Sequence, residues 1–165
     1  MLRRFPTLLL CLFFAFAFAA CDSGDDGDGN GNGNGNGNGN GTPPSAGVEA
    51  TIDGDAFVGT LVAIADRNND GSFDVVGSDG TGSLGITVET AATGTYAMGA
   101  QGTTGSYILT TGEAFTTALG GSGSVTVTSI SDERVAGTFS FTANSTLGNT
   151  TSVTNGGFNV AFTSE

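Results

Sequence analysis

The sequence predicts an all-β fold for residues 48–165, either an antiparallel β-sandwich or a rolled meander barrel of about 8–10 short strands. Apolar and polar side chains alternate there with a period of two, which places neighbouring residues on opposite faces of a strand. Short runs of β-branched and aromatic residues are separated by Gly, Asp and Asn, which favour turns. The spacing of apolar residues that is typical of helices is absent.

The alternation is clearest in four segments, 84–88, 125–127, 135–141 and 158–162. Leu, Ile, Val and Phe occupy most of one row of alternate positions, and Gly, Ala, Ser, Thr and Asn occupy the other. We therefore expect each strand to have one face in the core and one wet face rich in threonine. Seven Phe residues lie in this domain, so the core is adequate without a disulfide.

Four dipeptides predict tight turns, because Asn and Asp followed by Gly adopt left-handed backbone conformations easily. We expect each of them to connect two antiparallel strands that follow one another in the sequence. They are Asp53-Gly54, Asp70-Gly71, Asp79-Gly80 and Asn155-Gly156.

The first twenty-one residues have the pattern of a bacterial lipoprotein export signal. Arg3 and Arg4 precede an apolar segment, 8–20, that is too short to cross about 30 Å of hydrocarbon as a helix. The segment ends in Phe18-Ala19-Ala20-Cys21, which resembles a lipobox. It predicts a signal peptide over residues 1–20 and acylation of Cys21, for example with palmitate. The alternative is cleavage after Ala17-Phe18-Ala19 by an ordinary secretory peptidase, which would release a soluble protein.

Residues 21–47 join the expected lipidated Cys21 to the domain. They are rich in Gly, Asn and Asp, with strict Gly-Asn alternation from Gly29 to Gly41, and have no large apolar side chain to offset the entropy of ordering. We expect a flexible tether. Asp22 accompanies inner-membrane retention in some bacteria and surface export in others. We favour the outer membrane and leave the periplasmic or surface face open.

The charge balance excludes several functions. The chain has no His and no Lys, and beyond the leader only Arg67 and Arg134 face sixteen acidic residues. Such a surface repels the phosphates of nucleic acid. Serine or cysteine nucleophiles activated by His, lysine Schiff bases and His or Cys zinc sites all need residues that are missing. We therefore expect no enzyme, and a carboxylate-dependent glycoside hydrolase is the remaining alternative. Its nominated carboxylate pairs are Asp53 with Asp55 and Glu89 with Glu113.

One segment has the ligand spacing of a calcium loop. Oxygen-bearing side chains recur at alternate positions around Gly71, which would permit the sharp turn that such loops need. Position 12 of the pattern, where a glutamate usually closes the shell, is Gly77. The alternative is a polar hairpin loop between two strands. The candidate Ca²⁺ ligands are Asp66, Asn68, Asp70, Ser72 and Asp74.

Several motifs together resemble a family of uncharacterised lipoprotein domains from Gram-negative envelopes. They are Val48-x-Ala50-Thr51-Ile52-Asp53-Gly54-x-x-Phe57, Gly94-Thr95-Tyr96, Gly121-Ser122-Gly123 before Val125-Thr126-Val127-Thr128, GTFSFTA at 137–143, and Val153-Thr154-Asn155-Gly156-x-Phe158-Asn159-Val160. The resemblance implies a β architecture behind a lipid anchor. It implies no catalytic or binding residue, because the family has no established activity.

These observations predict a lipid-anchored domain of the cell envelope that serves as a structural or binding module. Its partners would be the membrane, through the N-terminal lipid, and an envelope protein or glycan. The alternative from another functional class is a carrier for a small ligand or glycan. An apolar cavity within the fold would favour the carrier.

Overall fold

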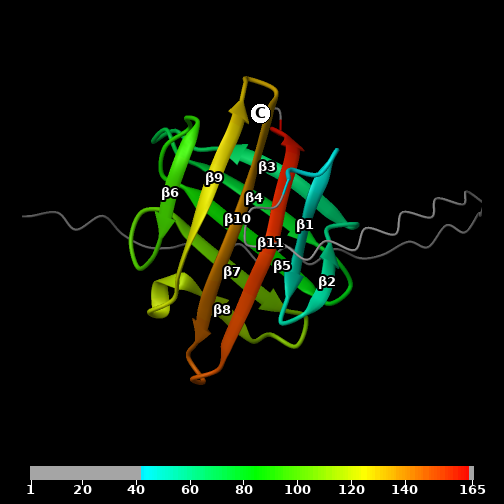
Figure 1. Cartoon of the computed structure of the whole chain (residues 1–165), viewed down its shortest axis with the longest axis vertical. Coiled ribbons are helices and arrows are strands. Elements are labelled where there is room, and N and C mark those ends of the chain that lie inside the picture. Colours follow the sequence, from blue (N-terminus) through cyan, green and yellow to red (C-terminus); the bar gives the residue numbers. More distant parts are fainter. Residues whose placement is uncertain (1–41, 164–165) are drawn as a thin grey trace, which may run out of the picture. The chain divides into compact units, whose positions relative to one another are not determined.

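The computed structural model describes residues 42–163, which form an antiparallel β structure with one short 3-10 helix (Figure 1). Its elements are β1 (Gly47–Ile52), β2 (Asp55–Val58), β3 (Val62–Arg67), β4 (Phe73–Ser78), β5 (Gly82–Val88), β6 (Gly94–Met98), β7 (Thr104–Leu109), β8 (Ala114–Thr116), η1 (Thr117–Leu119), β9 (Ser122–Ile130), β10 (Arg134–Ser145) and β11 (Thr150–Ala161).

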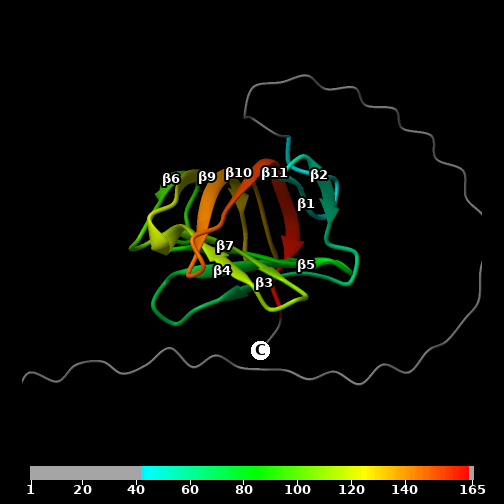
Figure 2. The same cartoon turned by 90° about the horizontal axis from the view of Figure 1, so that it is seen from below.

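All eleven strands belong to one sheet. Nine of them follow the order β2-β1-β11-β10-β8-β7-β5-β4-β3, while β9 pairs with β10 and carries β6 on its other side. The sheet curls so that β6, β9, β10, β11, β1 and β2 face β3, β4, β5 and β7 (Figure 2). This half-barrel confirms the predicted antiparallel all-β class. It combines the two facing layers of a sandwich with the continuous sheet of a barrel.

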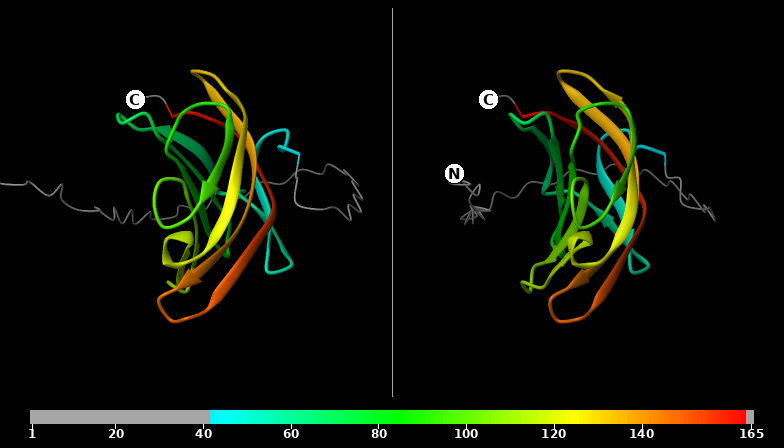
Figure 3. Two further views of the ribbon diagram at one scale, coloured as in Figure 1. Left: turned by 60° about the vertical axis from the view of Figure 1, so that its left-hand side comes forward. Right: turned by 90° about the vertical axis from the view of Figure 1, so that its left-hand side faces the viewer.

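The layers are joined along β10, which is long enough to pair with two successive strands. Its residues 135–142 pair with β9, and Asn144 and Ser145 pair with β8. Between these two partners, η1 carries the chain from one layer to the other. Glycine is required at Gly121, because a Cβ there would lie 2.2 Å from the carbonyl oxygen of Thr142. The two side views in Figure 3 show the long β10 and β11 strands, in orange and red, curving over the facing layer of green strands.

The edge strand β3 contacts the segment that directly follows β11, an interior strand of the sheet. Ala65 of β3 forms an isolated parallel bridge with Phe162, and the Thr163 N–H donates to the Ala65 carbonyl at 2.8 Å. Strand β1 also lies close to β3 and β4 along this side, where the Val48 side chain packs over Gly77.

The core lies between the layers and contains the predicted apolar rows. Leu84, Ile86 and Val88 of β5 are almost completely buried, as are the alternate apolar residues of β9, β10 and β11. Phe139 stacks against both Phe141 and Phe158, with ring centroids 6.3 Å apart in each pair. The predicted core rows are thus confirmed, but the predicted wet row of β10 is wrong at Ala136 and Thr138, which are also buried.

The predicted turns are correct at three of the four dipeptides. Asp53 and Gly54, with φ of 51° and 98°, form the two-residue loop between β1 and β2. Asp70-Gly71 and Asp79-Gly80 also lie in hairpin loops. The prediction for Asn155-Gly156 is wrong, because both residues lie inside β11. The register of β11 with β10 and with β1 shifts there, so the left-handed Asn155 (φ 50°) forms a β-bulge.

The first described residues rest on the outer face of β11. The side-chain amide of Asn159 donates to the Pro44 and Ser45 carbonyls, and Arg134 in turn donates to the Asn159 side-chain oxygen. The predicted signal peptide, Cys21 and most of the predicted tether lie outside the described residues. Within residues 42–163, no helix has the length and apolar character needed to cross a membrane.

Candidate functional site

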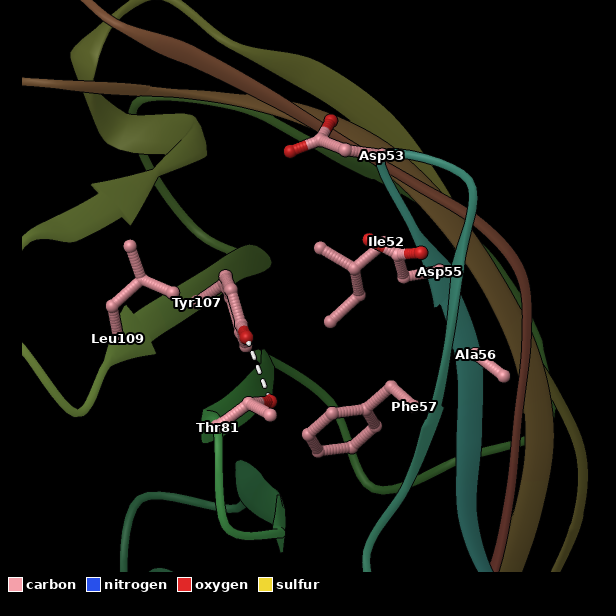
Figure 4. Close-up of a pocket in the computed structure, with 8 residues that line it drawn as sticks. All are labelled: Ile52, Asp53, Asp55, Ala56, Phe57, Thr81, Tyr107 and Leu109. Carbon is pink, nitrogen blue, oxygen red and sulfur yellow. Dashed lines mark hydrogen bonds between the residues drawn. The ribbon is translucent and has the colours of Figure 1, made fainter.

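A pocket of about 340 Å³ opens between the two layers, at the end of the half-barrel where β1 turns into β2 (Figure 4). One wall comes from the β1–β2 hairpin, and the other comes from β7 and the loop before β5. The lining residues are Ile52, Asp53, Asp55, Ala56, Phe57, Thr81, Tyr107 and Leu109.

Two aromatic rings from opposite layers form the floor of the pocket. Phe57 is 2% exposed and Tyr107 is 6% exposed, and their rings meet edge to face at 6.2 Å and 87°. Gly82 makes room for Tyr107, because a Cβ at that glycine would lie 2.8 Å from the tyrosine ring and hydroxyl. The Tyr107 and Thr81 hydroxyls lie 3.3 Å apart, at hydrogen-bonding distance. The floor is therefore apolar with one polar edge.

Asp55 lies on the core-facing side of β2, at the mouth of the pocket. It pairs across the strands with Ile52, and Phe57 two residues later pairs with Ala50. Side chains two residues apart share a face, so the Asp55 carboxylate lies on the same face as the buried Phe57. Figure 4 draws Asp53 and Asp55 on the β1–β2 side of the pocket, across from Tyr107 and Leu109.

The other carboxylates near the mouth hold the backbone. Asp53 accepts a hydrogen bond from the Thr151 hydroxyl at 2.8 Å and another from the Ser152 N–H at 2.7 Å, which fixes the hairpin turn to β11. Asp79 accepts from the hydroxyl and N–H of Thr81 and from the Gly82 N–H. Burial raises the pKa of Asp79, but these hydrogen bonds outweigh it and leave the pKa below its usual value.

The nominated carboxylate pairs have different positions. Asp53 and Asp55 both line the pocket, but Asp53 is engaged with β11. Glu89 follows β5, where its N–H donates to Thr103 just before β7, whereas Glu113 accepts a backbone hydrogen bond from Leu109 at the other end of β7. The six residues of β7 separate them by about 20 Å. This distance is too large for the pair of a glycoside hydrolase, which needs at most about 10 Å.

The predicted calcium ligands lie in the β3–β4 hairpin, at the other end of β4 from the pocket. Asn68 donates its side-chain amide to Ser72 and to Asp74, both at 2.9 Å, and Ser72 donates to Asp70 at 2.6 Å. These hydrogen bonds from Ser72 lower the pKa of Asp70. The structure thus links four of the five residues. The fifth, Asp66, accepts a hydrogen bond from Thr163 instead.

A hydrogen-bonded loop is not yet a metal site. In the part of the chain that the structure describes, no group of three acidic, His or Cys side chains is placed to hold a metal ion. The amide nitrogen of Asn68, which cannot bind a cation, faces the Asp74 carboxylate. Calcium binding by this loop therefore stays a prediction.

A second, polar pocket of about 500 Å³ lies beside this loop. Arg67 and Phe162 line it together with Asp66 and Asp132. The Arg67 guanidinium lies 4.1 Å from the centre of the Phe162 ring and donates to the Ser131 carbonyl. Most residues that line this pocket are polar or charged, whereas ligand sites are lined mainly by apolar side chains, so the apolar pocket between the layers is the better candidate for ligand binding.

The sequence analysis nominated Asp53 and Asp55 but missed the pocket walls. Nothing in the sequence marks the four apolar wall residues as neighbours; they are Ile52, Phe57, Tyr107 and Leu109. One signal was present, because Asp55 lies two residues before Phe57 and so shares its face of the strand. That signal becomes decisive only when the pairing of β1 with β2 is known.

Comparison with known proteins gives one match. A profile for a domain of unknown function, DUF6252, matches residues 44–160, which include all strands from β1 to β10 and most of β11. No curated protein and no solved structure matches the chain. This result confirms the predicted relationship to a domain family without an established activity. The chain belongs to the DUF6252 family.

Proposed function

We propose that this protein is a lipid-anchored domain of the bacterial cell envelope that binds a small ligand in the pocket between its two layers. The observation that carries the proposal is the pocket itself. Its walls are apolar and come from both layers, and its polar groups gather at the mouth. This is the usual composition of ligand sites in proteins.

The residues of the pocket support binding rather than catalysis. Asp53 is held by Thr151 and Ser152, and the second nominated pair, Glu89 and Glu113, lies at opposite ends of β7. An acid and a base acting on one bond must both reach it. An envelope protein or a glycan remains the alternative partner for the exposed surface, and the acidic surface disfavours nucleic acid.

The anchor is proposed from the sequence, at Cys21. The small residues before Cys21 favour its acylation, and we place the domain at the outer membrane. Metabolic labelling with palmitate should mark the wild-type protein and should not mark Cys21→Ala. Labelling that persists in the variant would remove the anchor from the proposal.

The pocket can be tested by nuclear magnetic resonance with neutral aromatic alcohols as probes. We expect changes in amide chemical shift at Asp55, Phe57, Gly82 and Leu109, with no change around Asn69 at the far end of β4. Variant Leu109→Ala should weaken the response. Variant Leu119→Ala is the matched control, because Leu119 is 45% exposed and lies in η1, away from the pocket. Shifts spread evenly over the domain, or none at all, would contradict a ligand site here.

A further inference from the structure

We propose that the pocket selects an organic cation, with a flat apolar body against Phe57 and Tyr107 and one ammonium group at the Asp55 carboxylate. This inference rests on the proposed ligand-binding function and adds the shape and charge of the ligand. Three features carry it: the paired rings, the carboxylate at the mouth of the pocket and the distribution of charge over the domain.

The rings define a body that is flat and apolar. Phe57 projects from β2 and Tyr107 from β7, so the two rings approach from opposite layers at 87°. Ile52 and Leu109 complete the apolar lining. The two rings pack against each other and are 2% and 6% exposed, so a flat ligand would contact their exposed edges together with Ile52 and Leu109.

The carboxylate defines the charge. Asp55 is exposed at the mouth, on the same face of β2 as the buried Phe57, so its negative charge lies at the entrance to the apolar space. Asp53 lies next to it on the hairpin turn, and Asp79 holds the backbone of Thr81 across the mouth. A cation entering here meets two acidic residues of the pocket lining, Asp53 and Asp55.

The basic residues are at the other end of the domain. Arg67 ends β3 beside Phe162, and Arg134 begins β10, where it contacts Asn159. The pocket instead adjoins the opposite ends of β1 and β4. No arginine of the described residues lines the pocket. The electrostatic potential at the mouth of the pocket therefore favours a positively charged ligand and disfavours a negatively charged one.

Asp55 has a competing explanation. Strand β2 pairs only with β1 and forms one edge of the sheet. A charge on the core-facing side of an edge strand discourages pairing with another molecule. The experiment must therefore separate ligand selection from protection of the edge.

Indole probes provide a direct measurement, because the chain contains no Trp and indole fluorescence reports only the probe. Tryptamine, tryptophol and indoleacetate share one ring system and carry positive, neutral and negative charge. Each is titrated with the purified full chain in non-ionic detergent at low ionic strength, and binding is read by fluorescence anisotropy. We expect tryptamine to bind about threefold to tenfold more tightly than tryptophol, and indoleacetate to bind most weakly.

Variant Asp55→Asn should abolish the preference for tryptamine over tryptophol while leaving the binding of tryptophol unchanged. The matched control is Glu49→Gln, which also removes one acidic charge but lies exposed on β1 outside the pocket. It should keep the preference. Added salt should reduce the preference in both the wild type and the control.

Three outcomes would overturn the inference. Equal binding of tryptamine and tryptophol to the wild type would leave the pocket as a ligand site without charge selection, so the proposed function would survive. Binding of none of the probes would remove both. A preference that persists in Asp55→Asn, accompanied by dimerisation of the variant in sedimentation, would assign Asp55 to protection of the β2 edge.

Discussion

Asn155 shows how one residue sets the path of a long strand. Its φ of 50° is in the left-handed region, which most side chains adopt only at a cost of about 1–2 kcal/mol. Asparagine and glycine tolerate it best. The bulge at this point shifts the register of β11 with both of its neighbours.

We therefore expect Asn155→Ala to lower the free energy of unfolding by about 1 kcal/mol, whereas Asn155→Gly leaves it nearly unchanged. Urea unfolding of both variants measures the difference. Thr154→Ala, an exposed neighbour in the same strand, is the control. Equal loss in the alanine and glycine variants would show that the Asn155 side chain, and not its backbone conformation, matters.

The stability that Asp79 contributes through its hydrogen-bonded turn should depend on pH. Its folded pKa is lowered, because the hydrogen bonds from Thr81 and Gly82 outweigh the effect of burial. Its contribution to stability is then fully present above the unfolded pKa and is lost as pH falls through the lowered folded value. Asp79→Asn should be less stable at neutral pH and should lose less on acidification. Denaturant midpoints measured from neutral to acidic pH test this, and parallel curves would argue against it.

At the scale of elements, the inner row of β10 contributes a large part of the core. Phe139 and Phe141 are 4% and 3% exposed and stack on each other. Phe139→Ala or Phe141→Ala should each cost about 3–5 kcal/mol of unfolding free energy. Thr142→Ala, on the exposed face of the same strand, should change it by less than about 0.5 kcal/mol. Near-neutral results for both Phe variants would refute the assigned faces.

The β3–β4 hairpin permits a test of the calcium hypothesis. Turning the Asn68 amide would present its oxygen, in place of its nitrogen, to Ser72 and Asp74. If the loop binds calcium, the ion should stabilise the domain by about 1.4 kcal/mol at ten times the dissociation constant. Thermal melts at constant ionic strength with calcium, magnesium or chelator measure it, and Asp70→Asn should remove the effect. Identical melts would identify an ordinary hairpin loop.

The elements also show what the sequence could predict. Alternation is a local property, so the buried rows of β5, β9 and β10 were predictable from the residues alone. The pairing of β6 with β9, and of β5 with β7, joins segments that are not consecutive and depends on the whole sheet. Asn155-Gly156 suits a turn and a bulge equally well, because both need a left-handed residue. The pocket depends on such pairings, and for that reason only its carboxylates were nominated.

At the scale of the whole molecule, the domain must tolerate its own charge. Residues 42–163 hold eleven acidic residues and only two arginines. Mutual repulsion among exposed carboxylates destabilises a compact state, and salt screens it, since the Debye length falls from about 10 Å at 0.1 M to about 3 Å at 1 M. We therefore expect the melting temperature to rise with sodium chloride up to molar concentration.

Salt can raise the melting temperature by screening charge repulsion or by general salting-out, and a variant with fewer acidic residues distinguishes the two effects. The double substitution Glu49→Gln with Glu89→Gln removes two exposed carboxylates, one in β1 and one just after β5. It should melt above the wild type at low salt, and the two melting temperatures should converge as salt is added, because screening removes the same repulsion that the substitutions remove. A constant difference between the two proteins at every salt concentration, or a wild-type melting temperature that does not respond to salt, would mean that the acidic surface carries no net repulsive cost.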